Sequence, residues 1–224
     1  MSGDFATLLG EIGAAEIGSA LRDPRDAVAD LPPLNARMRE ELAALLGTMN
    51  GFYSYEDAVH VYPAGDIDAE ISLGEWNSAA LWRLEYGQLA DNLVFVAEDL
   101  FGDQFAISGD DVVAFRAETG ERERLAGSLR EWLANVQRDA DFLTGRPIAN
   151  SWRQIHGRLP RGRRLMPVTP FVLGGSYDIQ NLRAVEAVDG MRFRGQLASQ
   201  IAGLPEGTDV RLIVRDRGVS PEDG

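Results

Sequence analysis

The chain has 224 residues, of which 45% are hydrophobic and 25% charged, a composition typical of a soluble globular protein. It contains no cysteine and no lysine, which excludes disulfides, thiol nucleophiles, cysteine metal sites, lysine Schiff bases and phosphate-binding loops that need a lysine. The net charge of −13 also argues against direct binding of nucleic acid, because the phosphate backbone would repel the protein.

The acidic residues are concentrated in the first part of the chain. Residues 1–140 hold 10 Arg against 26 Asp and Glu, whereas residues 141–224 hold 12 Arg against 9 acidic residues. An acidic surface can speed the capture of a basic protein partner, or it can simply keep the protein soluble. No apolar run approaches the roughly 20 residues that cross a bilayer, and residues 1–10 lack the pattern of a signal peptide, so we expect a cytoplasmic protein.

Two helices are expected near the start of the chain. Residues 4–21 have apolar side chains near helical spacing, although three glycines weaken that helix. Residues 34–49 form a clearer amphipathic pattern, and Asn50-Gly51 supplies a left-handed stop.

A short alternating strand is predicted for residues 58–62, just after an aromatic and acidic stretch. Tyr53 and Tyr55 in that stretch could form a contact patch for a partner, or their rings could cover the end of a sheet. His60 has no companion at metal-ligand spacing and is interpreted as an ordinary strand residue. Residues 74–86 follow, and their density of aromatic side chains favours a helical segment packed in the core.

The central feature of the sequence is the stretch from residue 92 to residue 107. It predicts a strand, an acidic turn over residues 98–103 and a second strand. Turns commonly carry binding residues, so Glu98, Asp99 and Asp103 become candidates for contact with a basic partner.

Further short strands are predicted after this hairpin, over residues 112–115 and 121–125, with Asp110 and Asp111 in the turn between the second and third strands. Strands joined by such short turns form an antiparallel meander, because parallel strands need a longer crossover. Ser128 then has the pattern of a helix N-cap, with Glu131 three positions later. A meander followed by a helix predicts the α+β class, with an antiparallel-dominated sheet and helices packed on one face.

The segment after residue 145 has a different character. We expect residues 1–145 to form the main domain and residues 146–224 a small β-α-β extension docked on it, with strands at residues 182–188 and 210–214 around a helix at 191–202. The basic stretch at residues 158–164 could contact phosphate, or it could lie ion-paired on the acidic first part.

Motifs for catalysis and for cofactor binding are missing. The sequence has no nucleophile elbow, no H-E-x-x-H and no dinucleotide fingerprint. Residues 66–70 resemble the start of a calcium loop but lack the required glycine and the final glutamate. We therefore expect no cofactor, no metal and no catalytic residues.

The order of these segments resembles the SUKH superfamily, the Smi/Knr-like group, over about residues 31–143. The matching pieces are Thr48-Met49-Asn50-Gly51-Phe52, Trp76-Asn77, Leu81-Trp82, the hairpin of residues 94–107, Glu118-Thr119-Gly120-Glu121 and the helix Ser128-Leu129-Arg130-Glu131-Trp132-Leu133. The resemblance implies an α+β fold without catalytic residues. In bacteria it implies an immunity protein that neutralises a secreted toxin, often a nuclease or a deaminase. Relatives in eukaryotes are regulators of cell-wall synthesis that act as interaction proteins.

The leading hypothesis is thus a non-enzymatic protein that binds a basic partner, through a surface formed by Tyr53, Tyr55, Glu98, Asp99, Asp103, Asp110 and Asp111. Two other classes remain open. An adaptor would recruit partners through an exposed apolar patch on the extension, and an acid-assisted hydrolase would hold Glu98 and Asp103 in a deep cleft.

Overall fold

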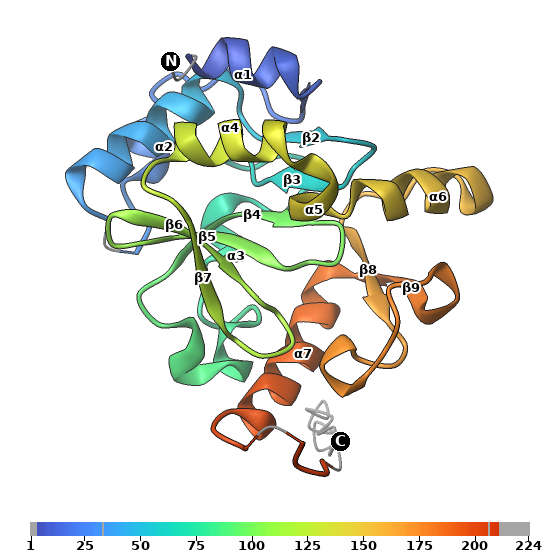
Figure 1. Ribbon diagram of the computed structural model, residues 1–224. Coiled ribbons are helices and arrows are strands. Elements are labelled where there is room, and N and C mark those ends of the chain that lie inside the picture. Colours follow the sequence, from blue (N-terminus) through green and yellow to red (C-terminus); the bar gives the residue numbers. More distant parts are fainter. Residues whose placement is uncertain (1–3, 33, 206, 211–224) are drawn as a thin grey trace, which may run out of the picture.

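The computed structural model describes residues 4–32, 34–205 and 207–210 of the chain and belongs to the α+β class (Figure 1). A seven-stranded sheet runs in the order β1-β2-β3-β4-β5-β6-β7, and every neighbouring pair is antiparallel. A separate antiparallel hairpin, β8-β9, follows later in the chain. The predicted meander is therefore confirmed and is longer than the sequence indicated.

The strands are β1 (Ala15–Glu16), β2 (Phe52–Ser54), β3 (Val59–Val61), β4 (Val94–Asp99), β5 (Gln104–Ser108), β6 (Asp111–Phe115), β7 (Arg122–Ala126), β8 (Arg163–Pro167) and β9 (Leu182–Glu186). The α-helices are α1 (Phe5–Glu11), α2 (Ala36–Thr48), α3 (Leu73–Trp76), α4 (Leu129–Arg138), α5 (Ala140–Thr144), α6 (Arg146–His156) and α7 (Ala187–Ile201). Short 3-10 turns occupy Asp26–Val28, Arg83–Glu85, Gly87–Ala90, Phe171–Leu173 and Ile179–Asn181.

Three helices, α1, α2 and α4, cover one face of the sheet (Figure 1). Helix α4 begins where the sequence predicted, because the Ser128 side chain accepts a hydrogen bond from the Glu131 backbone N–H. Its Trp132 is fully buried, and the ring lies 5.1 Å from the ring of Phe105 on β5. This contact joins the helical layer to the middle of the sheet.

The opposite face is also covered, which corrects the expectation that helices pack on one face only. Trp82 lies 4.8 Å from Phe95 of β4, and Tyr86 lies 5.1 Å from Phe115 of β6, measured between ring centroids. Helix α7 packs against this aromatic layer at Gly195, where an added Cβ would come within 2.6 to 2.9 Å of Glu85 and Tyr86 side-chain atoms. The central strands β4, β5 and β6 are buried on both faces, and both faces therefore need cover.

Several elements differ from their predictions. The first helix ends at Glu11 and is followed by β1, so the glycine-rich remainder of residues 4–21 is not helical. Helix α6 was not predicted, although Pro147 near its first position is a common helix start.

Among the residues described, the C-terminal extension has the order α6, β8, β9 and α7, so β9 and α7 match the predicted strand at 182–188 and helix at 191–202. Strand β8 was not predicted and begins within the basic stretch, at Arg163, and the predicted strand at 210–214 lies almost wholly outside the described residues.

Asn77 fastens the segment after α3 to the sheet. Its buried amide accepts a hydrogen bond from the backbone N–H of Phe95 at 2.9 Å and donates to the carbonyls of Phe95 at 2.8 Å and Leu73 at 2.9 Å. We predict that Asn77→Ala lowers the free energy of unfolding by about 2 kcal/mol or more, since it leaves buried backbone groups without partners. Urea denaturation would measure this loss.

The exposed Arg153→Ala should change the free energy of unfolding by no more than about 0.5 kcal/mol and is the control. Equal urea midpoints for the two variants would contradict the role given to Asn77.

Candidate functional site

The acidic turn is divided between the two faces of the sheet. Strand β4 continues through Asp99, and neighbouring strand residues point to opposite faces, so Glu98 and Asp99 diverge. Glu98 points to the face covered by α7 and is 2% exposed, whereas Asp99 and Asp103 line a groove on the other face. The sequence had suggested that the three carboxyl groups form one exposed patch. The structure shows that they do not.

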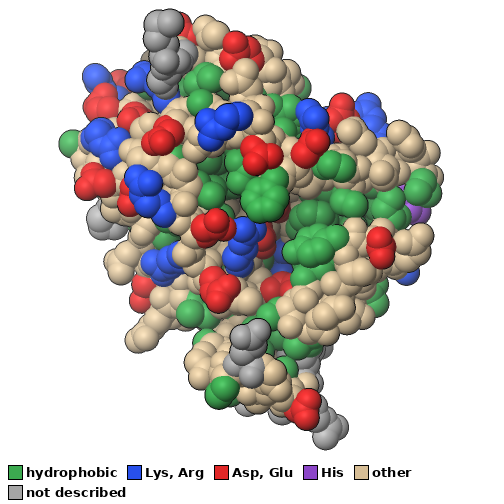
Figure 2. Space-filling view, viewed as in Figure 1, with side chains coloured by type: hydrophobic (Ala, Val, Ile, Leu, Met, Phe, Trp, Pro, Cys, Tyr) green, Lys and Arg blue, Asp and Glu red, His purple; other side chains and the backbone are tan. Residues whose placement is uncertain are grey.

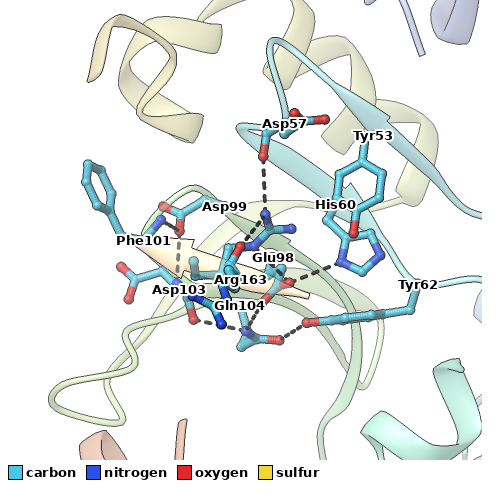
Figure 3. Close-up of polar contacts among 12 residues, drawn as sticks. Tyr53, Asp57, His60, Tyr62, Glu98, Asp99, Phe101, Asp103, Gln104 and Arg163 are labelled. Carbon is cyan, nitrogen blue, oxygen red and sulfur yellow. Dashed lines mark hydrogen bonds and ion pairs between the residues drawn. The ribbon is translucent and has the colours of Figure 1, made fainter. Parts of the chain in front are cut away.

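Glu98 is the centre of a buried polar cluster (Figure 3). Nδ1 of His60 on β3 donates to its Oε1 at 3.0 Å, and the Arg164 Nε on β8 lies 2.8 Å from the same oxygen. The Arg164 contact is an ion pair by distance and is not aligned as a hydrogen bond. Both partners of the pair are almost fully buried, at 2% and 3% exposure.

Gln104, opposite Glu98 on β5, extends the cluster. Its side-chain oxygen accepts hydrogen bonds from the Tyr62 hydroxyl at 2.9 Å and the Trp76 indole N–H at 2.8 Å. Its amide nitrogen donates to the carbonyl of Gly102 at 2.9 Å and lies 3.4 Å from Glu98 Oε2. The cluster thus connects the β2-β3 hairpin, the central strands and α3.

The electrostatics of the cluster keep Glu98 ionised. Burial alone would raise the pKa of Glu98, but the Arg164 guanidinium and the hydrogen bonds from His60 and Gln104 together lower the pKa to about 2. Burial lowers the pKa of His60, which favours its neutral form. A permanently ionised, inaccessible carboxylate serves as an anchor for a counter-ion and cannot exchange protons with a substrate at neutral pH.

The basic stretch at residues 158–164 is ion-paired with the first part of the chain, the second of the two alternatives raised by the sequence. Arg158 binds Asp57 through two hydrogen bonds of 2.8 Å, and Arg161 lies 3.1 Å from Glu70. Together with the Arg164–Glu98 pair, three arginines of this stretch each form an ion pair with an acidic residue of the first part. A phosphate would therefore have to compete with these carboxylates for the arginines.

The tip of the β2-β3 hairpin has a strained backbone at the place where Arg158 binds it. Tyr55, Glu56 and Asp57 have φ values of 52°, 56° and 71°, a left-handed conformation that costs non-glycine residues about 1 kcal/mol or more each. The Arg164 guanidinium also donates to the Asp57 carbonyl. The C-terminal segment therefore holds this tip in its unusual shape.

A groove of about 460 Å³ opens on the other face of the sheet. Its base includes Phe105 and Ala114 from the strands, and its side near α5 carries Phe142, whose side chain is largely exposed. Tyr177, from the loop between β8 and β9, lines the other side. Figure 2 shows hydrophobic side chains gathered across the middle and right of this face, beside acidic and basic ones.

An aromatic wall forms the Tyr177 side of the groove. Phe171 and Tyr177 stack with ring centroids 3.8 Å apart and planes inclined by 9°. Phe101 in the β4-β5 turn lies 5.6 Å from each of them, nearly perpendicular to both rings. Figure 3 shows the Phe101 ring directed away from the buried cluster. Two distant parts of the chain, the turn and the extension, thus build this wall together.

Asp99 and Asp103 lie in the groove with fixed orientations. Asp99 Oδ1 accepts hydrogen bonds from the backbone N–H groups of Phe101 and Asp103, both at 2.9 Å. Asp103 accepts from the Ala117 N–H at 2.8 Å and pairs with Arg116 at 3.2 Å. Burial, with the nearby charge of Asp103, raises the pKa of Asp99 well above its usual value. Such a pair could pass a proton, or it could receive a cation.

The remaining predicted site residues are dispersed. Tyr53 is buried and stacks on His60 with ring centroids 4.4 Å apart, so it cannot serve as a contact residue. Tyr55 is partly buried, with the Arg146 guanidinium 5.4 Å from its ring centre. Asp110 and Asp111 lie at the β5-β6 turn, paired with Arg37 and Arg124, and do not line the groove.

Sequence reasoning missed the roles of Arg164 and His60. Nothing in a strand pattern separates a histidine that binds a buried carboxylate from one that does not. A glutamate inside an otherwise apolar strand is a usable signal, because a buried carboxylate requires a partner. Reading Glu98 as part of the strand, instead of the turn, would have indicated that an arginine from elsewhere must reach it.

No group of three or more His, Asp or Glu side chains that could hold a metal ion occurs in the part of the chain that the structure describes. Within the same residues, no helix has the length and apolar character needed to cross a membrane.

Comparison with known proteins supports the fold. No protein-family model and no curated protein matches the chain. Among solved structures, the chain is similar to the crystal structure of Atu4351 from Agrobacterium tumefaciens, with 15% sequence identity and a TM-score of 0.56. The match covers 84% of this chain and 86% of that one, which is more than residues 1–145 alone could supply, so it includes part of the C-terminal extension. At this identity the similarity shows a shared fold and nothing about function.

We predict that Arg164→Met lowers the free energy of unfolding by about 3 to 5 kcal/mol, because it leaves Glu98 charged and buried without a counter-ion. The adjacent Arg163 is the matched control, since it pairs with Glu186 and both side chains are about half exposed. Arg163→Met should therefore cost no more than about 1 kcal/mol.

Adding Glu98→Gln to Arg164→Met should restore much of the lost stability, because the double variant buries no charge. Chemical denaturation of the four proteins measures these differences. A similar loss for Arg163→Met and Arg164→Met would contradict the buried ion pair.

The stability of the protein should depend on pH through His60. Because its folded-state pKa is lowered, His60 stabilises the fold above the unfolded-state pKa of about 6.5, and that contribution is lost as the pH falls. From pH 7 to pH 5 this one group should remove up to about 1.4 kcal/mol of stability per pH unit.

His60→Gln keeps a donor for Glu98 and should have a flatter stability profile over the same range. Asp99 and Glu118 have raised pKa values, so they increase the stability as the pH falls, opposite to His60. Both groups are present in both proteins, and the difference between the two profiles therefore reports on His60 alone. Parallel profiles would show that His60 binds protons equally in the folded and unfolded states, which would contradict its lowered pKa.

Proposed function

We propose that the chain is a non-enzymatic binding protein, an immunity protein that neutralises a bacterial toxin of the nuclease or deaminase class by direct contact. The observation that carries the proposal is the groove, which combines exposed aromatic side chains and carboxylates on a protein of net charge −13. Exposed apolar surface with a polar rim is typical of a site for another protein.

The polar chemistry of the chain supports binding over catalysis. Glu98 and His60 are buried and used to hold Arg164, so neither is available to a substrate. Asp99 and Asp103 are hydrogen-bonded to the backbone, in positions that close the β4-β5 turn and attach it to the chain after β6. Among the described residues that line the groove there is neither histidine nor serine, so the aspartate pair has no such side-chain nucleophile to activate.

The charge of the chain favours a basic partner. An excess of 13 negative charges raises the rate at which a positively charged protein is captured, and repels nucleic acid, the substrate of a nuclease. Proteins that act on nucleic acid need basic surfaces of their own. An acidic protein that covers such a surface would both bind the toxin and exclude its substrate.

The toxin class comes from the resemblance to the SUKH superfamily, whose bacterial members protect against toxins of these kinds. The α+β fold with a meander at its centre agrees with that resemblance. The similarity to Atu4351 concerns the fold alone. The proposal places the protein in the cytoplasm, where such a toxin would act.

An adaptor role is the second candidate. Several large apolar side chains of the C-terminal extension are exposed, among them Ile155, Val168, Val172 and Tyr177. This is the kind of patch by which an adaptor could recruit another protein. A partner that binds the extension without being inactivated would favour this role.

Co-expression provides the test. We predict that the chain restores growth to bacteria producing the toxin encoded next to its gene, and that the two proteins co-purify. A catalytically inactive form of the same toxin should bind equally well, because the interaction requires contact and not turnover. Continued killing in the presence of the folded chain, or failure to co-purify, would contradict the immunity proposal.

A further inference from the structure

The groove has a defined shape before any partner arrives. The Phe171–Tyr177 stack and the perpendicular Phe101 ring hold the aromatic wall in place, although 59% of Tyr177 is exposed. On the other side Phe142 is 75% exposed and packs on little of its own chain. Rigid aromatic side chains offer large contact area at small cost in conformational entropy, which is the usual character of an anchor site.

The charges around the groove are unevenly balanced. Asp99, Asp103 and Asp141 all line it, whereas Arg116 is the one basic residue in its lining among residues 4–32, 34–205 and 207–210. Arg116 is shared between Asp103 at 3.2 Å and Glu123 at 2.8 Å, and Arg146 pairs with Asp141 at 2.7 Å. The arginines near the groove are thus already engaged with carboxylates, and by formal charge the three lining aspartates outnumber Arg116.

This combination selects among possible occupants. A nucleic acid is repelled by the carboxylates, and a second copy of this chain would bring a further 13 negative charges. A cationic side chain is attracted by the carboxylates and also by the exposed face of an aromatic ring. The apolar walls favour a neighbouring apolar side chain.

We propose that the groove is the docking site for the basic partner, and that it receives a segment in which an arginine or lysine lies next to an apolar or aromatic side chain. The cation reaches the Asp103 and Asp141 carboxylates, whose side chains are 25% and 59% exposed, while the apolar side chain packs between Phe142 and Tyr177. This inference rests on the proposed function, since it takes the toxin as the partner. It locates the interface at the junction of the main sheet and the C-terminal extension, so both parts contribute to binding.

The test measures the affinity of variants for the inactivated toxin by calorimetry. Phe142→Glu and Tyr177→Glu should each weaken binding by about tenfold or more, as expected for buried anchor residues. Leu84→Glu is the matched control, because Leu84 is 57% exposed and lies away from the groove. Leu84→Glu should leave the affinity within about threefold of the unaltered chain, and thermal melts would verify that all three variants fold.

A second pair of variants separates local from general charge. Asp103→Asn with Asp141→Asn removes two charges from the groove, and asparagine can still accept the hydrogen bond from the Ala117 N–H. Asp110→Asn with Asp111→Asn removes two charges outside it. The groove pair should weaken binding more and should flatten its dependence on salt more strongly.

The outcomes distinguish the two proposals. If the unaltered chain does not bind the toxin, both the proposed function and the docking site fail. If the unaltered chain binds and neutralises the toxin, but the Phe142 and Tyr177 variants bind as tightly as the Leu84 control, the function stands and the groove proposal is wrong. Equal effects of the two charge pairs on the affinity would likewise show that the groove does not bind the cation. A dimer of the chain that Phe142→Glu dissociates, with unchanged toxin affinity, would assign the groove to a second copy.

Discussion

The opposite charges of Glu98 and Arg164 lie inside the protein, where neither could remain ionised without the other. This constraint explains why the extension is attached where it is. Arg164 reaches the central strand β4 from β8, and its neighbours Arg158 and Arg161 meet Asp57 and Glu70 on the way. Replacing such a pair by apolar residues can be neutral in energy, so its main effect is to specify one position for β8 relative to the sheet.

The groove depends on that position. Its aromatic wall combines Phe101 of the β4-β5 turn with Phe171 and Tyr177 of the extension, and only a fixed extension brings these rings into contact. The alternation of side chains along β4 then assigns two roles to adjacent acidic residues. Glu98 faces the buried cluster and determines structure, while Asp99 faces the groove together with Asp103. A stretch read as one acidic turn thus serves two separate surfaces.

The sequence predicted local features better than long-range ones. Helix α2, its glycine stop, the Ser128 cap and the order of strands β4 to β7 follow from periodicity and turn chemistry within a few residues. The cover on the second face, the pairing of Arg164 with Glu98 and the aromatic wall depend on residues far apart in the chain. Turn composition also misled: Glu98 resembles a turn residue by its acidity, yet its backbone continues the strand because β3 and β5 flank it.

The place of Arg164 in the chain has a consequence for how the protein is made. All seven strands of the main sheet leave the ribosome before Arg164 does. Until then Glu98 has no counter-ion, and closing the sheet around it would bury an uncompensated charge. Until β8 emerges, the nascent chain therefore keeps the region around β3, β4 and β5 open to water, or neutralises Glu98 by protonating Glu98 itself or its partner His60. Completion of the fold is in this way linked to the emergence of β8, and a product that ends before Arg164 would expose its central strands.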